Sequence, residues 1–173
     1  MNQPDLALTS PSSTHLHQEE LIGEILADYR LGWLSRHASL LGRKEVLTGK
    51  AKFGIFGDGK ELPQIAWAKA FQKGDFRSGY YRDQTLLLSQ DLLTGREIFS
   101  ALYGHPDKVY ERMSGGRQMS GHFLTHTIDE NDNWIDQTKH KNHISDISPT
   151  ASQMSRLVGL GLASKIYRDN TVN

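Results

Sequence analysis

The residues best suited to chemistry in this chain fall in three short stretches. The first is Tyr80-Tyr81-Arg82, in which an arginine follows two aromatic residues and Gly79. A buried guanidinium without a partner is costly, so Arg82 needs either an anionic ligand or a carboxylate from elsewhere in the chain. Both interpretations stay open on the residues alone.

The second stretch, residues 115–122, contains three glycines together with Arg117 and His122. Backbone of this composition can approach a ligand closely, because glycine has no side chain in the way. The alternative is a flexible surface loop.

The third stretch, residues 147–153, reads Ile-Ser-Pro-Thr-Ala-Ser-Gln. Ser148, Pro149 and Thr150 are typical of a helix start. From Ala151 onward apolar residues recur every three or four positions, which predicts a helix preceded by a polar loop over residues 142–148. Free N–H groups and hydroxyls at such a start suit an anion or an oxygen-ligated cation. The alternative is an ordinary capped helix in a core.

Two other patterns resemble metal sites. Gly57-Asp58-Gly59 has the form of a magnesium motif, but no asparagine follows near residues 85–88, so we predict a tight turn. The pair His122 and His126 has metal-compatible spacing, as does the group of His140, His143 and Asp146, yet both lie in polar sequence without a known zinc arrangement. We therefore interpret these histidines as exposed residues.

The elements that must position these stretches are predominantly helical. We expect residues 1–18 to form a disordered tail, because they are polar and contain prolines. Helices are predicted over residues 19–42, 62–71, 85–93 and 96–103 and from Ala151 to Tyr167, with an extended segment over 79–82, a loop over 104–121 and an exposed hairpin or excursion over 125–142. Arg30, Arg36 and Arg43 are expected on a solvated face of the first helix.

Composition excludes several classes of protein. The chain has 173 residues, the length of one domain, with 20 Lys and Arg against 20 Asp and Glu. Zero net charge gives no electrostatic case for nucleic acid or a membrane as a partner. The absence of cysteine rules out disulfides and thiolate chemistry, and no apolar run is long enough for a transmembrane helix. We expect a cytoplasmic protein.

In this order, residues 81–83 (Tyr-Arg-Asp), residues 116–122 (Gly-Arg-Gln-Met through His122) and residues 147–153 resemble one family. It is the alpha subunit of the thiamine-diphosphate-dependent 2-oxoacid dehydrogenases, the first, decarboxylating component of the complex. The Gly-Arg-Gln-Met element is more similar to the branched-chain type than to the pyruvate type. The resemblance extends from about residue 41 to residue 170.

The resemblance implies roles for individual residues. Tyr81 and Arg82 would bind the diphosphate of the cofactor, Ser148 and Thr150 would lie against its centre, and His122 would line the pocket as the candidate catalytic residue. A structural potassium ion of the branched-chain type would be bound by the oxygen atoms of Ile147, Pro149, Ser152 and Gln153. Two positions depart from the pattern: Gln84 stands where pyruvate-type members commonly have histidine, and Ile147 replaces a small polar residue, so that its ligand would be a carbonyl.

For fold and function, the resemblance implies an α/β thiamine-diphosphate-binding fold, of which the chain holds the largely helical N-terminal portion and the first strands only. The protein would decarboxylate a 2-oxoacid, of a branched-chain kind such as 3-methyl-2-oxobutanoate, and pass the acyl group to a lipoyl arm. Its partners would be a beta subunit or fused beta domain, in a heterotetramer, and the lipoyl acyltransferase component.

The family's magnesium motif is expected soon after the last predicted helix, and the sequence reaches Asn173 without it. We therefore expect residues 19–173 to be the N-terminal portion of the cofactor-binding domain, cut short before the magnesium ligands and inactive alone. The alternatives are a pyruvate- or acetoin-type member and, from another class, a non-catalytic assembly module that pairs with a beta-like partner.

Overall fold

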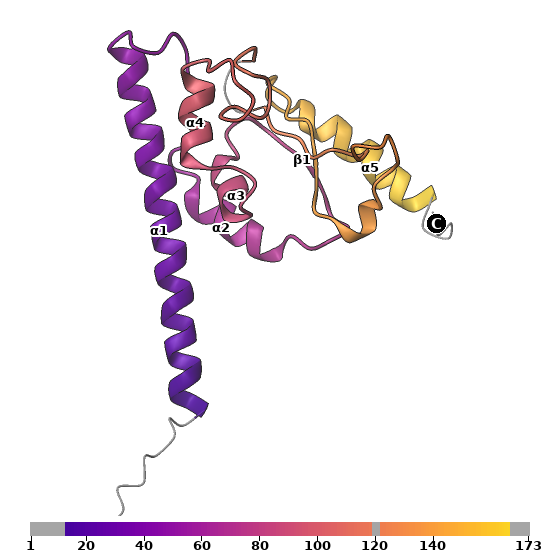
Figure 1. Ribbon diagram of the computed structural model, residues 1–173. Helices are drawn as coiled ribbons and strands as arrows, with labels where there is room; N and C mark the ends of the chain where they lie inside the picture. Colours follow the sequence, from indigo (N-terminus) through magenta and orange to yellow (C-terminus); the bar gives the residue numbers. More distant parts are fainter. Residues whose placement is uncertain (1–12, 119–121, 167–173) are drawn as a thin grey trace, which may run out of the picture.

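A computed structural model describes residues 13–118 and 122–166 of the chain (Figure 1). In this part of the chain, helices surround a small parallel sheet, which is compatible with a fragment of an α/β fold. The elements, in chain order, are α1 (Ser13–Leu47), α2 (Glu61–Ala70), β1 (Phe76–Ser78), α3 (Gln84–Ser89), α4 (Gly95–Leu102), the 3₁₀ helix η1 (Gln137–Lys139), β2 (Asn142–Ile144) and α5 (Ser152–Ile166).

The longest element is α1, whose C-terminal half packs on the other helices while its N-terminal half projects away from them (Figure 1). A core cluster joins it to α3 and α4 through Ala38, Leu88 and Ile98. The helix begins at Ser13, so the tail predicted to reach residue 18 was wrong over its last residues, and residues 1–12 lie outside the described part. It also continues past Gly42, the predicted end, because this glycine leaves room for the ring of Phe56.

A layer of buried polar groups holds α3 between α1 and α2. Ser35 Oγ and Thr85 Oγ1 lie 2.7 Å apart in a hydrogen bond, and Gln84 Nε2 donates to Ser39 Oγ at 2.7 Å. From α2, Gln64 accepts from the backbone N–H of Thr85 at 3.0 Å and donates to the carbonyl of Arg82 at 3.0 Å. These bonds fix the turn that precedes α3, and with it the backbone of Arg82.

The parallel sheet pairs Phe76 with Asn142 and Ser78 with Ile144. Both strands differ from the predictions. The extended segment is β1, which precedes the predicted residues 79–82, and the loop predicted over residues 142–148 begins with β2. The cause is non-local: the backbone N–H of Asn142 donates to the carbonyl of Asp75 at 3.0 Å, and Asn142 Nδ2 donates to the same carbonyl at 3.2 Å. Residues 79–82 form a turn, closed by the N–H of Asp83 donating to the carbonyl of Tyr80 at 2.9 Å.

The predicted excursion between residues 125 and 142 is present. Its two sides meet in an antiparallel bridge between Ile128 and Trp134, and Asp129 Oδ1 accepts from the backbone N–H groups of Asn131 and Asn133 at 2.8 and 2.9 Å. The turn predicted at Gly57-Asp58-Gly59 is also confirmed, and Asp58 there pairs with Arg43.

The last helix, α5, lies outside the core. It begins at Ser152, one residue later than predicted, because Ala151 adopts a left-handed φ of 69°. None of its residues is buried, and no atom of the described chain lies near the flank formed by Gly159 and Gly161. The close backbone neighbour expected for this flank is therefore not among the described residues. No helix in the described ranges is long and apolar enough to cross a membrane.

Candidate functional site

A buried ion-pair cluster underlies the turn of residues 79–82. Arg77 Nη2 donates to Asp83 Oδ2 at 2.9 Å and to Asp146 Oδ1 at 2.7 Å, and the side chains of Arg77 and Asp146 are 0% exposed. Burial raises the pKa of Asp146, while the charge of Arg77 opposes that rise. Gly79 lies against both groups and leaves no space for a side chain. The cluster therefore joins β1 to the loop after β2.

Sequence reasoning missed this cluster. Arg77 and Asp146 are 69 residues apart, and only a strand register that turns Arg77 inward would have suggested the pairing. Asp146 had been grouped instead with His140 and His143 as a metal-compatible set. No group of three or more His, Cys, Asp or Glu side chains in the described ranges is arranged to hold a metal ion. His143 is buried rather than exposed, which corrects that interpretation.

Arg82 is placed quite differently from Arg77. Its guanidinium carbon lies 5.6 Å from the ring centre of Tyr80 and 5.4 Å from that of Tyr81, and the side chain is only half buried. Its Nε is nevertheless buried without a hydrogen-bond partner, and no carboxylate of the described residues pairs with it. Because buried donors are almost always satisfied, Arg82 has capacity for an acceptor that these residues do not provide.

The two tyrosines beside Arg82 form a coupled pair. Their hydroxyl oxygens share a hydrogen bond of 2.7 Å, and their ring centres are 4.1 Å apart. That bond, followed by a contact with the hydroxyl of Thr150, holds the pKa of Tyr80 below its ordinary value, and the charge of Arg82 adds to the effect. The shared bond raises the pKa of Tyr81. Thr150, from the loop before α5, thus reaches the Tyr80–Arg82 turn.

His122 lies on the other side of Tyr81, with the two ring centres 6.0 Å apart. Its Nε2 is hydrogen-bonded to Ser148 Oγ, and the backbone N–H of Ile147 donates to the carbonyl of Gly79 at 3.2 Å. The fold therefore gathers Tyr81, His122 and Ser148, which come from three separate stretches of the sequence. Met119 and Gly121, which precede His122 in the motif, lie outside the described residues.

The four residues expected to bind potassium lie around the start of α5: Ile147 and Pro149 precede the helix, and Ser152 and Gln153 are its first two residues. Gln153 Nε2 donates to the carbonyl of Ile147 at 2.8 Å, and the N–H of Ser152 donates to the carbonyl of Pro149 at 3.2 Å. Carbonyl, hydroxyl and amide oxygens are suitable ligands for a hard cation. In this arrangement the amide nitrogen of Gln153 faces Ile147, so the amide must rotate before its oxygen can join such a set.

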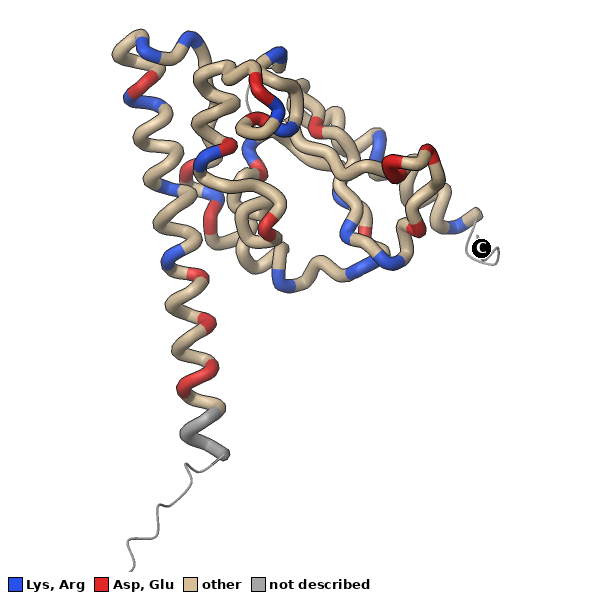
Figure 2. The backbone as a smooth tube through the Cα atoms, in the orientation of Figure 1, with Lys and Arg blue, Asp and Glu red and all other residues tan. Residues whose placement is uncertain are grey.

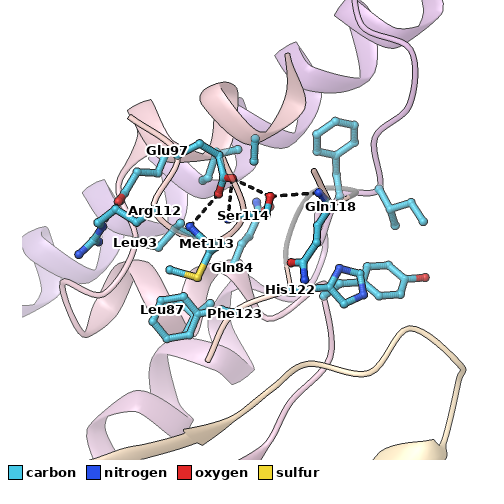
Figure 3. Close-up of a pocket in the computed structure, with 16 residues that line it drawn as sticks. Gln84, Leu87, Leu93, Glu97, Arg112, Met113, Ser114, Gln118, His122 and Phe123 are labelled. Atoms are coloured by element: carbon cyan, nitrogen blue, oxygen red, sulfur yellow. Dashed lines mark hydrogen bonds and ion pairs between the residues drawn. The ribbon is translucent and has the colours of Figure 1, made fainter. Parts of the chain in front are cut away.

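An apolar cavity opens beside Tyr81 and His122 (Figure 3). Leu87, Met113 and Phe123 lie together on one side of it, and Gln118 lies with His122 on the other. The loop that closes it is organised by the carboxylate of Glu111, which accepts from three backbone N–H groups, those of Met113 at 3.0 Å, Ser114 at 2.8 Å and Gly116 at 2.9 Å. Burial is the largest single influence on the pKa of Glu111 and raises it, but the hydrogen bonds together outweigh burial, so that the pKa is lowered. Gln84 also lines the cavity, although its side-chain amide is hydrogen-bonded to Ser39 of α1.

Comparison with known proteins gives one informative result. The 2-oxoisovalerate dehydrogenase subunit alpha of Bacillus subtilis (strain 168) is 26% identical to this chain over 164 residues. The chain is a distant relative of that subunit. The alignment covers 94% of this chain and 41% of the subunit, so the chain spans less than half of its relative's length. No family model matches the chain.

The geometry divides the candidate residues into two groups. Tyr81, Arg82, His122 and Ser148 converge, with Thr150 beside Tyr80. Ile147, Pro149, Ser152 and Gln153 form the turn behind them. The first group offers donors, and the second contains the carbonyl oxygens of Ile147 and Pro149, which accept bonds from Gln153 and Ser152.

Proposed function

We propose that this chain supplies the diphosphate-holding part of a thiamine-diphosphate site in a branched-chain 2-oxoacid dehydrogenase. The observation that carries the proposal is Arg82, whose guanidinium lies over two tyrosine rings with a buried Nε that lacks a partner. The name of the distant relative supports the class of reaction. The convergence of His122 and Ser148 on the same turn supports the position of the site.

The residues present fit a diphosphate group. A guanidinium presents several N–H donors in one plane, which match the oxygens of a phosphate, and such charge-assisted bonds are about twice as strong as neutral ones. Tyr81 supplies a further hydroxyl, and Ser148 and Thr150 supply hydroxyls from the loop before α5. The free N–H groups at the start of a helix add a favourable dipole.

Thiamine diphosphate, when bound, supplies the nucleophilic carbon and the electron sink for decarboxylation, which no side chain here provides. The contribution of this chain is to hold and orient. His122 is fixed by its bond to Ser148 and by the ring of Tyr81, so its imidazole can exchange a proton at Nε2 at a defined place. The magnesium ion, the beta-type partner and transfer to a lipoyl arm belong to the same proposal.

The cavity supports the proposed substrate class. Its apolar wall, which includes Leu87, Met113 and Phe123, suits an aliphatic group. This favours a branched-chain 2-oxoacid over the smaller pyruvate or acetoin, which would leave such a wall uncovered.

A sharp test measures binding of thiamine diphosphate to this chain without a metal ion or a partner chain. One arginine–phosphate contact with a helix terminus supports at most about 4 kcal/mol, which corresponds to a dissociation constant of the order of 1 mM. The phosphorus NMR signals of thiamine diphosphate should therefore broaden weakly and specifically when the 173-residue chain is added. The Arg82→Gln variant should abolish this broadening.

Arg96→Gln is the matched control, since Arg96 also lies over a tyrosine, Tyr110 at 5.2 Å, but away from the site. This control should retain the broadening, and thiamine without the diphosphate should not compete for binding. Equal broadening by both variants would show that Arg82 is not the anion ligand.

A non-catalytic assembly module is the second candidate, and α5 is the observation that favours it, because a helix with no buried residue needs a covering surface. Such a module would bind a beta-type partner equally well with Arg82 intact or replaced, and in the presence or absence of thiamine diphosphate. An enzyme subunit would bind that partner more tightly with the cofactor present.

A further inference from the structure

The projecting helix α1 has two apolar faces. One faces the body of the protein and contains Leu31, Ser35 and Ala38. The other points the opposite way, because its residues are displaced from the first set by about half a turn. This outer face consists of Ile22, Ile25, Leu26, Tyr29, Trp33 and Leu40, all of which are exposed.

The outer face is a stripe and not a scatter of single residues, although Arg36, which pairs with Glu61, interrupts it between Trp33 and Leu40. Its members recur at spacings of three, four and seven, and the stripe from Ile22 to Leu40 is about 27 Å long. Tyr29 is 68% and Trp33 is 53% exposed. Trp33 is also held in place, since its ring stacks on that of His37 at 3.8 Å. A rigid aromatic anchor of this kind is typical of protein interfaces.

The charges of α1 are largely separated along its length; the exception is Glu45 near the C-terminal end, which pairs with Lys50. Between residues 17 and 29 every charged residue is acidic, and between residues 30 and 44 every charged residue is basic (Figure 2). The acidic set is Glu19, Glu20, Glu24 and Asp28, and the basic set is Arg30, Arg36, Arg43 and Lys44.

Part of each set is already paired within the chain. Glu24 and Asp28 contact Lys69, while Arg36 and Arg43 contact Glu61 and Asp58. Within the described part of the chain, four charges on α1 have no ion pair, two near its N-terminal end and two further along. They are Glu19, Glu20, Arg30 and Lys44.

We propose that the outer face of α1 pairs with the same face of a second copy of this chain, with the two helices antiparallel. A two-fold axis near the middle of the stripe sets Tyr29 opposite Trp33 and Ile22 opposite Leu40 of the second copy. It also brings the acidic half of each helix against the basic half of the other, with Glu19 near Lys44. A parallel pair would instead place like charges together.

The second copy is the occupant that the charges favour. A single partner helix would need the reverse charge order on a matching apolar face, and an antiparallel copy of α1 supplies both. The interface repeats each contact twice, as a two-fold axis requires, and two long aromatic-rich stripes can approach the roughly 800 Å² per partner of a stable complex.

The first experiment measures association of the 173-residue chain by sedimentation across a range of concentrations. We expect a dimer whose dissociation constant rises at least tenfold in Tyr29→Glu. Val158→Glu on α5 is the matched control, because Val158 is exposed to a similar degree, at 72%, but lies outside the proposed interface. A monomer at all concentrations overturns the proposal, as does association that Val158→Glu disrupts and Tyr29→Glu does not.

The second experiment determines orientation and benefits from the absence of cysteine in the chain. The double variant Ile22→Cys with Leu40→Cys should form an intermolecular disulfide rapidly, whereas each single variant should not. Rapid crosslinking of the single variants would indicate parallel helices and overturn the antiparallel arrangement. Glu19→Lys and Lys44→Glu should each weaken the dimer about threefold, and together restore it.

Discussion

Arg77 and Arg82 are five residues apart on either side of Gly79, and they differ in both burial and ion pairing. Arg77 is fully buried and bonded to two carboxylates, Asp83 and Asp146. Arg82 is half exposed, is stacked on tyrosines and has no carboxylate partner in the described ranges. A buried ion pair is costly to break, whereas an unpaired cation at a surface is available to a ligand. The comparison shows that Arg77 stabilises the fold around the turn of residues 79–82, whereas Arg82 is available to bind a ligand.

The largest effect should come from removing the structural arginine. Arg77→Met leaves the buried carboxylate of Asp146 without its partner and should lower the free energy of unfolding by roughly 3–5 kcal/mol. Arg82→Met should change it by less than about 1 kcal/mol. Urea denaturation of the two variants measures both values. Similar losses of unfolding free energy in the two variants would show that the two arginines have the same structural role.

The second largest effect is a pH dependence of stability that arises from His143, a buried residue near Arg77. Burial, and then the charge of Arg77, lowers the pKa of His143 from 6.5 to about 4. Above pH 6.5 the residue is neutral in both states, and below it the unfolded chain gains a proton that the folded chain resists. Stability should therefore fall between pH 6.5 and 4, by up to roughly 3 kcal/mol.

The His143→Phe variant tests this assignment. It should flatten the pH dependence in that window, even if the variant is less stable at pH 7, because Gln90 then loses its partner. His126→Phe, which alters an exposed histidine, is the control and should leave the slope unchanged. If both variants keep the slope, another group is responsible for the loss of stability.

A third prediction concerns the other arginine. In an assembly with the proposed beta-type partner, Arg82→Ala should raise the apparent dissociation constant for thiamine diphosphate at least tenfold, because a charge-assisted contact is lost. The thermal midpoint without cofactor should stay within a degree or two of the unaltered protein. A large shift of that midpoint with unchanged affinity for the cofactor would assign Arg82 to the same structural role as Arg77.

The smallest effect should come from the turn that contains Pro149, Ser152 and Gln153. Replacing potassium by tetramethylammonium should weaken cofactor binding severalfold and speed proteolysis of residues 145–151, because a large cation cannot enter a set of converging oxygens. Gln153→Ala should show the same weak binding in potassium and should not respond to the exchange. Indifference of the unaltered protein to potassium would remove the cation site from the proposal.

How much the sequence predicted depended on the range of the interactions involved. Both α2 and α4 were close to their predicted positions, because local periodicity and the capping box of Thr94 with Glu97 determine them. The strands were missed because each has three residues, and Asn142 and His143 look like loop residues until their distant partners are known.

The site shows the same division. The candidate residues came from motifs, and the fold does bring Tyr81, His122 and Ser148 together. What supports them did not come from motifs. The pairing of Arg77 with Asp146, and the commitment of Gln84 to Ser39, rest on contacts across many residues that no local pattern contains.

Ala151 gives the start of α5 a mechanical property. An alanine in the left-handed region, with φ at 69°, costs about 1–2 kcal/mol, which a glycine would avoid, but it also restricts rotation at the point where the loop becomes the helix. Rotation of the backbone between α5 and the loop that contains Ser148 and Thr150 is therefore restricted. If a protein bound to the exposed face of α5 and rotated the helix slightly, the hydroxyls of Ser148 and Thr150 would move with it.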